Sequence, residues 1–218
     1  MELELKRGGR TARVETLGGE LVSYRDERGL EYIWGGDPAY WPGRNPLLFP
    51  IVGMLKEGKI RFDGREYAME RHGFARRREF TPAARGEDWV RLELRESAET
   101  LALYPYPFRL AVEQRLTDTG FSTAVTVANP GEGPLPFCLG AHTGFRCPLE
   151  AGERFEDYEL VFPERESCPT LLLRDGLLDR PAALPCLEDT DTLPLDYRWF
   201  DALDTLIFEG LRSRSVAL

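Results

Sequence analysis

Alternation of apolar and polar residues is the feature that most constrains how this chain can fold. It runs through Leu3–Lys6 and Trp89–Arg95, and Phe121–Ala128 is rich in β-branched residues. Side chains of a strand point alternately to its two faces, so a period of two predicts half-buried antiparallel strands. Helical character is confined to Glu96–Leu103, and Pro105 beyond it limits this segment to one or two turns.

Short turn sequences separate the predicted strands. Asp63-Gly64, between Ile60–Phe62 and Arg65–Tyr67, is typical of a type I′ hairpin, because both residues tolerate a positive φ. We therefore predict an all-β chain that forms one large antiparallel sandwich domain over residues 1–218. Residues 34–58 and 163–200 are predicted to be long, proline-rich connections, and such loops often carry the functional site.

Composition argues against several classes of protein. The 218 residues include 28 Lys and Arg against 37 Asp and Glu, a net charge of −9 that disfavours binding to nucleic acids. The two histidines and four cysteines show no metal-ligand spacing, so we predict no metal site. No segment approaches the roughly 18 apolar residues of a membrane span, and the first residues lack the apolar core of a signal peptide. We predict a cytoplasmic protein without a membrane partner, while its oligomeric state stays open.

The histidines are the best candidates for a chemical role. The sequence contains no G-x-S-x-G, phosphate-loop or H-E-x-x-H motif, which disfavours serine hydrolases, nucleotide enzymes and zinc proteases. His72 and His142 are each followed within a few residues by Gly and Phe. Glycine lets a ligand approach the backbone, and an aromatic ring offers a face to a sugar. The alternative is that both are structural or surface histidines.

Two segments around these histidines resemble a known family. The run from Asn45 to Gly53, followed by the Asp63-Gly64 hairpin and by His72-Gly-Phe-Ala-Arg76, is similar to the aldose 1-epimerase (galactose mutarotase-like) family, and most to its LacX-type branch. Gly140–Phe145 resembles that family's second histidine motif. Asp204–Phe208 resembles its aspartate-bearing strand, so the resemblance extends over nearly the whole chain.

The resemblance implies a fold and an activity. The fold is a large antiparallel β-supersandwich with an open sugar-binding face. The activity is that of a carbohydrate isomerase, which interconverts the α and β anomers of an aldose by acid/base ring opening and uses no metal or organic cofactor. Imidazole, with an ordinary pKa of about 6.5, suits proton exchange near neutral pH.

The resemblance also implies roles for individual residues. His142 would be the general acid at the ring oxygen, and His72 would hydrogen-bond and polarise the same region. Asp204, Arg76 and Asn45 would bind the substrate. Each binding residue has a simpler reading: Asp204 as a strand-edge charge, Arg76 as part of an exposed basic turn, and Asn45 as a turn residue before proline.

The chain departs from the family pattern in two places. Many relatives have Arg where this chain has Met54, and a thioether cannot donate to a hydroxyl. The family's general base is a Glu close to its C-terminus, in the LacX-type branch near a Trp-Glu-Gly motif, and no such motif occurs before Leu218. We therefore expect the chain to be incomplete at its C-terminus, lacking its last strands, and we assign no residue as the base.

These departures keep other functions open. The main alternative is a non-catalytic carbohydrate-binding or sugar-sensing module of the same fold. A sugar phosphate is a less favoured substrate, because the acidic balance of the chain opposes it. A structural interaction domain is a third possibility. It predicts that His72 and His142 lie far apart, whereas a sugar site requires both to reach one small ring.

Overall fold

The computed structural model describes residues 1–201 and 203–218, except for the side chains of residues 180–185. It contains two compact units, Met1–Arg146 and Cys147–Leu218, each of which is described by itself. The prediction of one domain that lacks its last strands stays a prediction.

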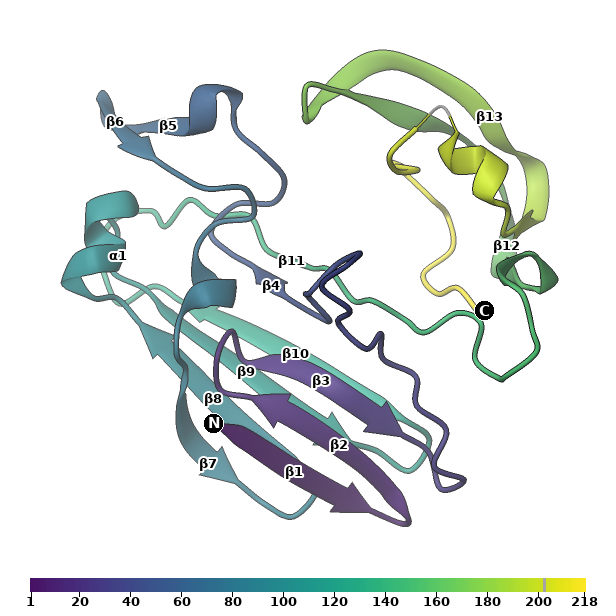
Figure 1. Cartoon of the computed structure of the whole chain (residues 1–218). Helices are drawn as coiled ribbons and strands as arrows, with labels where there is room; N and C mark the ends of the chain where they lie inside the picture. The colour runs from purple at the N-terminus through teal and green to yellow at the C-terminus, as the bar shows by residue number, and fades with distance from the viewer. Residues whose placement is uncertain (202) are drawn as a thin grey trace. The chain divides into compact units, whose positions relative to one another are not determined.

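Two antiparallel sheets pack face to face in the first unit (Figure 1). One sheet has the order β1-β2-β3 and consists of β1 (Glu2–Arg7), β2 (Arg10–Glu15) and β3 (Glu20–Arg25). The other has the order β10-β9-β8-β7 and consists of β7 (Thr81–Arg85), β8 (Trp89–Arg95), β9 (Arg109–Leu116) and β10 (Phe121–Ala128). Contacts of β1 and β2 with β9 join the two layers.

The core lies between these layers and follows the alternation of the sequence. In β1 the side chains of Leu3 and Leu5 are buried, whereas those of Glu2 and Glu4 are exposed. The same pattern recurs in β8, where each buried residue follows a more exposed one. Burial of apolar surface stabilises the fold by about 25 cal/mol per Å². This favours the observed register, because a shift by one residue would turn every apolar side chain of the strand to solvent.

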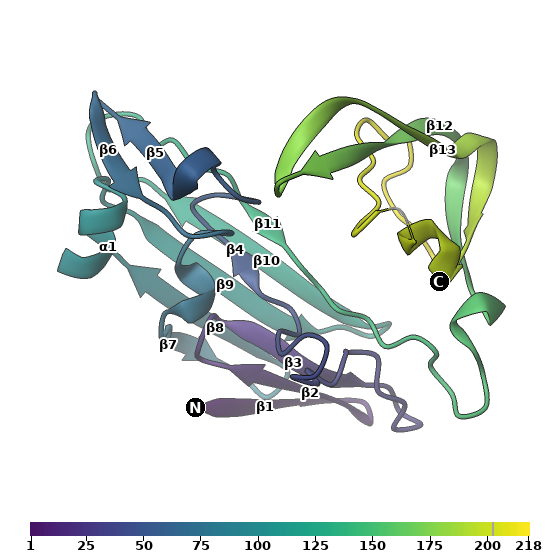
Figure 2. The same cartoon turned by 45° about the horizontal axis from the view of Figure 1, so that its top comes forward.

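Short elements lie in the connections outside the two sheets. They are β4 (Leu47–Leu48), which pairs with β11 (Gly140–Ala141), the hairpin of β5 (Lys59–Phe62) and β6 (Arg65–Ala68), and α1 (Ala98–Leu103). Figure 2 shows α1 beside β6. Further 3-10 turns lie at Lys56–Gly58 and Ala75–Arg77.

Three sequence predictions are confirmed in this unit. Asp63 and Gly64 have φ angles of 46° and 80° and join β5 to β6, as predicted for a type I′ turn. The predicted short helix begins after Ser97, whose side chain accepts a hydrogen bond from the Thr100 amide. Residues 34–58 form a long connection that contains only β4 and one 3-10 turn.

The second unit corrects one prediction. Residues 163–200 are not a loop, because most of them belong to a long two-stranded ribbon of β12 (Glu159–Arg174) and β13 (Leu177–Pro194). The prolines suggested a loop, because proline has no N–H to donate to a neighbouring strand. In a two-stranded ribbon each strand also has an unpaired edge, and a proline that faces this edge removes no hydrogen bond between the strands. Register shifts interrupt the pairing around Pro163 and Pro169. A 3-10 turn precedes the ribbon at Phe155–Asp157 and another follows it at Tyr197–Phe200.

A buried carboxylate attaches the end of this unit to the ribbon. Glu166 is 1% exposed and accepts hydrogen bonds from the backbone amides of Arg212 and Ser213 at 3.0 and 2.7 Å. These hydrogen bonds lower the pKa of the Glu166 carboxyl, because they stabilise its charged form. Among the described residues of the chain, no helix is long and apolar enough to cross a membrane.

Candidate functional site

A two-stranded ladder positions His142. The pairing of β4 with β11 continues to His142, whose amide donates to Pro46, and to Gly144, whose amide donates to Arg44. Neighbouring side chains on such a ladder point to opposite faces. His142 therefore lies on one face, and Thr143 lies on the other.

A second backbone contact positions His72. The segments 49–53 and 70–75 lie against each other through the parallel bridge between Phe49 and Gly73. The Phe74 amide donates to the Phe49 carbonyl at 3.0 Å, and the His72 amide donates to the Gly53 carbonyl at 2.8 Å. His72 and Gly73 both have positive φ angles, 68° and 69°, and this turn directs the His72 side chain back toward Gly53.

The His72 imidazole is held in one tautomer. The Gly53 amide donates to His72 Nδ1 at 3.0 Å, so Nδ1 carries no proton and Nε2 carries it. Burial lowers the pKa of His72, and the charges of Arg76, His142 and Arg71 lower it further. His72 is thus a neutral imidazole at neutral pH, and its Nε2–H, which has no acceptor among the described residues, can donate to a ligand.

This lowered pKa predicts a loss of stability in acid. The folded pKa of His72 lies below its ordinary value of 6.5, so the unfolded state takes up the proton first. The free energy of unfolding should fall as the pH drops from 6.5 toward the folded pKa, with the full contribution present above 6.5. Urea denaturation on both sides of this range measures the effect. His72→Gln, which does not titrate, should lose less stability over the same range, and equal losses in both proteins would contradict the assignment.

The structure brings the two histidines together. The centroids of the His72 and His142 rings are 5.8 Å apart, with an angle of 61° between the rings. This separation is what a sugar site requires, and it differs from the wide separation that a structural interaction domain predicts. The indole of Trp41 also lies against the His142 ring, with ring centroids 4.9 Å apart.

Arg76 lies beside His72, and not all of its N–H donors are used in hydrogen bonds to the described residues. Its Nη2 donates to the Arg71 carbonyl at 2.8 Å, and its Nε is buried without a hydrogen-bond partner among the described residues. Arg77 and Arg78 form ion pairs with Glu70 and Glu99, whereas the described residues give Arg76 no such partner. Burial lowers the pKa of Arg76, with a further contribution from Arg77, but a guanidinium stays charged at neutral pH. The three arginines are therefore not one uniform exposed basic turn.

Asn45 lies on the opposite face of the ladder from His142. Its side chain is 9% exposed, and its Oδ1 accepts a hydrogen bond from Thr143 Oγ1 at 2.6 Å. Both residues line a cavity of about 310 Å³ together with Tyr24 and Tyr32. The structure does not place Asn45 with the two histidines, so direct contact with a ligand at that face is not supported.

Asp204 belongs to the second unit. It occupies an exposed bend, and Ile207, three residues further on, pairs with the ribbon through a bridge to Leu171. Its role as a sugar ligand stays a prediction. Met54 directly follows the Gly53 that holds His72, and its side chain is half-buried.

Sequence reasoning missed two parts of this site. From the sequence, Trp41 and Phe49 could stack on a sugar, although a place in the core is favoured for both, and Phe49 is fully buried. The contact of Trp41 with His142 depends on the fold, and the one available signal was its glycine neighbour at position 43. Glu20 was not singled out at all. Its carboxylate accepts hydrogen bonds from the amides of Arg44 and Asn45 and so anchors the start of the ladder.

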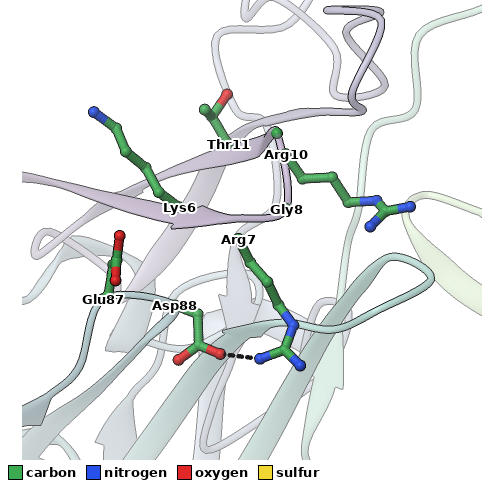
Figure 3. A pocket seen from close by; sticks show the side chains of 8 residues that line it. Lys6, Arg7, Gly8, Arg10, Thr11, Glu87 and Asp88 are labelled. Atoms are coloured by element: carbon green, nitrogen blue, oxygen red, sulfur yellow. Dashed lines mark hydrogen bonds and ion pairs between the residues drawn. The ribbon is translucent and has the colours of Figure 1, made fainter.

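A cavity elsewhere in the first unit contains none of these residues. It has a volume of about 590 Å³ and lies at the turn between β1 and β2, next to Glu87 and Asp88. Figure 3 shows Arg7 paired with Asp88 in this cavity, and Arg7 also pairs with Asp118. Its cations already have ion-pair partners, since Lys6 pairs with Glu4 and Arg10 with Glu27, so it is a poor candidate for the site.

Comparison with solved structures defines the class of the fold. A galactose mutarotase related enzyme from Lactobacillus acidophilus superposes with a TM-score of 0.89 at 27% identity, over 98% of this chain and 74% of that chain. A galactose mutarotase-like protein from Lactobacillus casei ATCC 334 gives a TM-score of 0.80 at 30% identity, over 91% and 68%. The fold is therefore all-β and galactose mutarotase-like.

Sequence comparison then identifies the family. The model of the aldose 1-epimerase family matches residues 1–179. The plasmid-encoded protein LacX of Lactococcus lactis subsp. lactis is 41% identical over 226 residues, which cover 100% of this chain and 75% of LacX. The chain belongs to the aldose 1-epimerase family, as the two histidine motifs predicted. Family and fold support a carbohydrate epimerase or mutarotase function.

Proposed function

We propose that this protein interconverts the α and β anomers of an aldose by acid/base opening of the sugar ring. The observation that carries the proposal is the pair of imidazoles 5.8 Å apart, of which His72 is fixed as a neutral donor. One small ring can contact both, and Arg76 adds charged donors beside them.

The reaction requires two proton transfers. A base removes the proton of the C1 hydroxyl, and its electron pair forms the C1 carbonyl as the bond between C1 and the ring oxygen breaks. An acid delivers a proton to that ring oxygen. Rotation about the bond between C1 and C2, followed by closure in the reverse sense, gives the other anomer.

His142 suits the acid in this scheme. Its imidazole has no hydrogen bond to another protein group among the described residues, so both ring nitrogens are available to a ligand. His72 is neutral and donates through Nε2, which stabilises the negative charge that develops on oxygen as the ring opens.

The remaining predicted residues have supporting roles in this proposal. Arg76 binds hydroxyl groups beside His72, and Asp204 binds sugar hydroxyls. Asn45 acts indirectly, because its hydrogen bond to Thr143 fixes the residue that follows His142. The base is left unassigned, and the scheme uses proton transfer alone, without a cofactor. A cytoplasmic location is part of the same proposal.

Polarimetry tests the proposal. Freshly dissolved α-glucose or α-galactose changes its optical rotation spontaneously, and the protein should increase that rate in proportion to its concentration. Buffer alone provides the baseline, since buffer acids and bases also catalyse the reaction. A rate that never exceeds this baseline for either sugar would rule out both as substrates.

A second candidate function is a sugar-binding module without catalysis. Met54 favours it. This residue follows Gly53, whose amide holds His72, and its thioether donates no hydrogen bond at a position where many relatives have Arg. Isothermal titration calorimetry distinguishes the two. Saturable binding of a hexose without faster mutarotation supports the module, and the absence of binding to every hexose tested removes it.

A further inference from the structure

The two histidines of the site are held in different ways. His72 is fixed by hydrogen bonds of its backbone and of its Nδ1 to Gly53. The His142 imidazole has no comparable hydrogen bond among the described residues, and its ring contacts are with Trp41 and His72. Its orientation therefore depends on packing against these two rings.

The Trp41 indole is itself tightly confined. A Cβ added to Gly43 would lie 2.7 Å from Trp41 Cζ2, and one added to Gly144 would lie 2.8 Å from Trp41 Cζ3. Real Cβ atoms do not approach so closely, so the indole occupies space that only glycine leaves free at both positions. The backbone of Trp41 is held as well: its amide donates a hydrogen bond to the Asp37 carbonyl, and its carbonyl accepts one from Trp34 Nε1.

We propose that Trp41 is a positioning residue for His142. Its indole, held between Gly43 and Gly144, keeps the imidazole of His142 turned toward His72. The ring centroids lie 4.9 Å apart with an angle of 37° between the rings, within the range of favourable aromatic stacking. The catalytic consequence rests on the proposed function, whereas the positioning itself does not.

Nuclear magnetic resonance of the imidazole protons tests the positioning. The chain has only two histidines, so the two sets of signals can be assigned with His72→Gln. The indole ring current should shift the His142 signals upfield. Trp41→Leu should abolish that shift, and Trp41→Phe should keep part of it. Trp89→Leu is the matched control, since Trp89 also packs against a glycine, Gly86, in the same unit and should leave His142 unchanged.

A second variant leaves Trp41 itself intact. Gly43→Ala adds one methyl group, whose three nearest neighbours are all atoms of the Trp41 indole, and it should displace the indole from His142. The backbone at Gly43 has no positive φ, so alanine brings no strain of its own. The His142 signals should then move in the same direction as in Trp41→Leu.

The catalytic readout separates positioning from general damage to the fold. Stacking worth about 0.5–1.5 kcal/mol corresponds to a roughly 2- to 10-fold lower kcat in Trp41→Leu and Gly43→Ala, with KM nearly unchanged. Trp41→Phe should restore most of kcat.

Two results would overturn the proposal. One is that the His142 signals of the unaltered protein show no upfield shift. The other is that Trp41→Leu and Gly43→Ala both have the same kcat as the unaltered protein. If the unaltered protein exchanges no anomers, the proposed function fails, and the imidazole signals alone decide whether Trp41 orients His142.

Discussion

Replacement of His142 by asparagine should lower kcat for anomer interconversion by about 10²- to 10⁴-fold, the usual contribution of a general acid. The amide has no proton to transfer near neutral pH, while its size and polarity preserve much of the local packing. KM should change little, because His142 acts on the ring oxygen in the transition state more than it binds the ground state. Initial rates by polarimetry over a range of sugar concentrations measure both constants.

Thr143→Val is the matched control for this prediction. Thr143 is the next residue, but its side chain lies on the opposite face of the ladder, where its hydroxyl donates a hydrogen bond to Asn45 Oδ1. Its replacement should change kcat by only a few-fold, through the lost hydrogen bond of about 1 kcal/mol. If His142→Asn kept a rate similar to that of Thr143→Val, His142 would not be the acid.

Replacement of Gly73 by alanine should destabilise the protein by about 3–5 kcal/mol, the range of severe single substitutions. A Cβ at this position would lie 2.2 Å from the Phe49 carbonyl oxygen and 2.5 Å from its carbon, so the backbone would have to move. That movement would break the hydrogen bonds that the Phe49 carbonyl accepts from Phe74 and Ala75. His72 precedes Gly73 directly, so the activity should fall as well.

Gly64→Ala separates the collision from the conformational strain. Gly64 also has a positive φ, 80°, but a Cβ there would meet no atom within 4 Å. This variant should cost only about 1–2 kcal/mol for the left-handed conformation. Urea denaturation of both variants measures the difference, and equal losses of stability would show that the contact between Phe49 and Gly73 is unimportant.

Much of the first unit was predictable because local signals and packing agree there. The alternation of Trp89–Arg95 corresponds to β8, and Asp63-Gly64 forms the predicted turn. The ribbon of the second unit was missed because its prolines were interpreted as breaks. The same sequence contains Asp175-Gly176, whose φ angles of 51° and 75° form the hairpin turn between β12 and β13.

The site was predictable at the level of its motifs but not of its contacts. His72 and His142 are 70 positions apart in the sequence, and only the pairing of distant segments brings their rings together. Asn45 shows the limit most clearly. Its neighbour Pro46 pairs with His142, but the alternation of the ladder turns the Asn45 side chain to the other face. A motif alone does not indicate which face of a strand its residues occupy.

Exchange spectroscopy of an aldose at equilibrium tests the central claim most directly. The α and β anomeric protons give separate signals, and saturation passes between them only when the anomers interconvert. The protein should increase this exchange in proportion to its concentration, and His142→Asn should reduce the increase by about 10²-fold or more. Saturable sugar binding without any added exchange, for every aldose tested, would contradict the account and leave the protein a sugar-binding module.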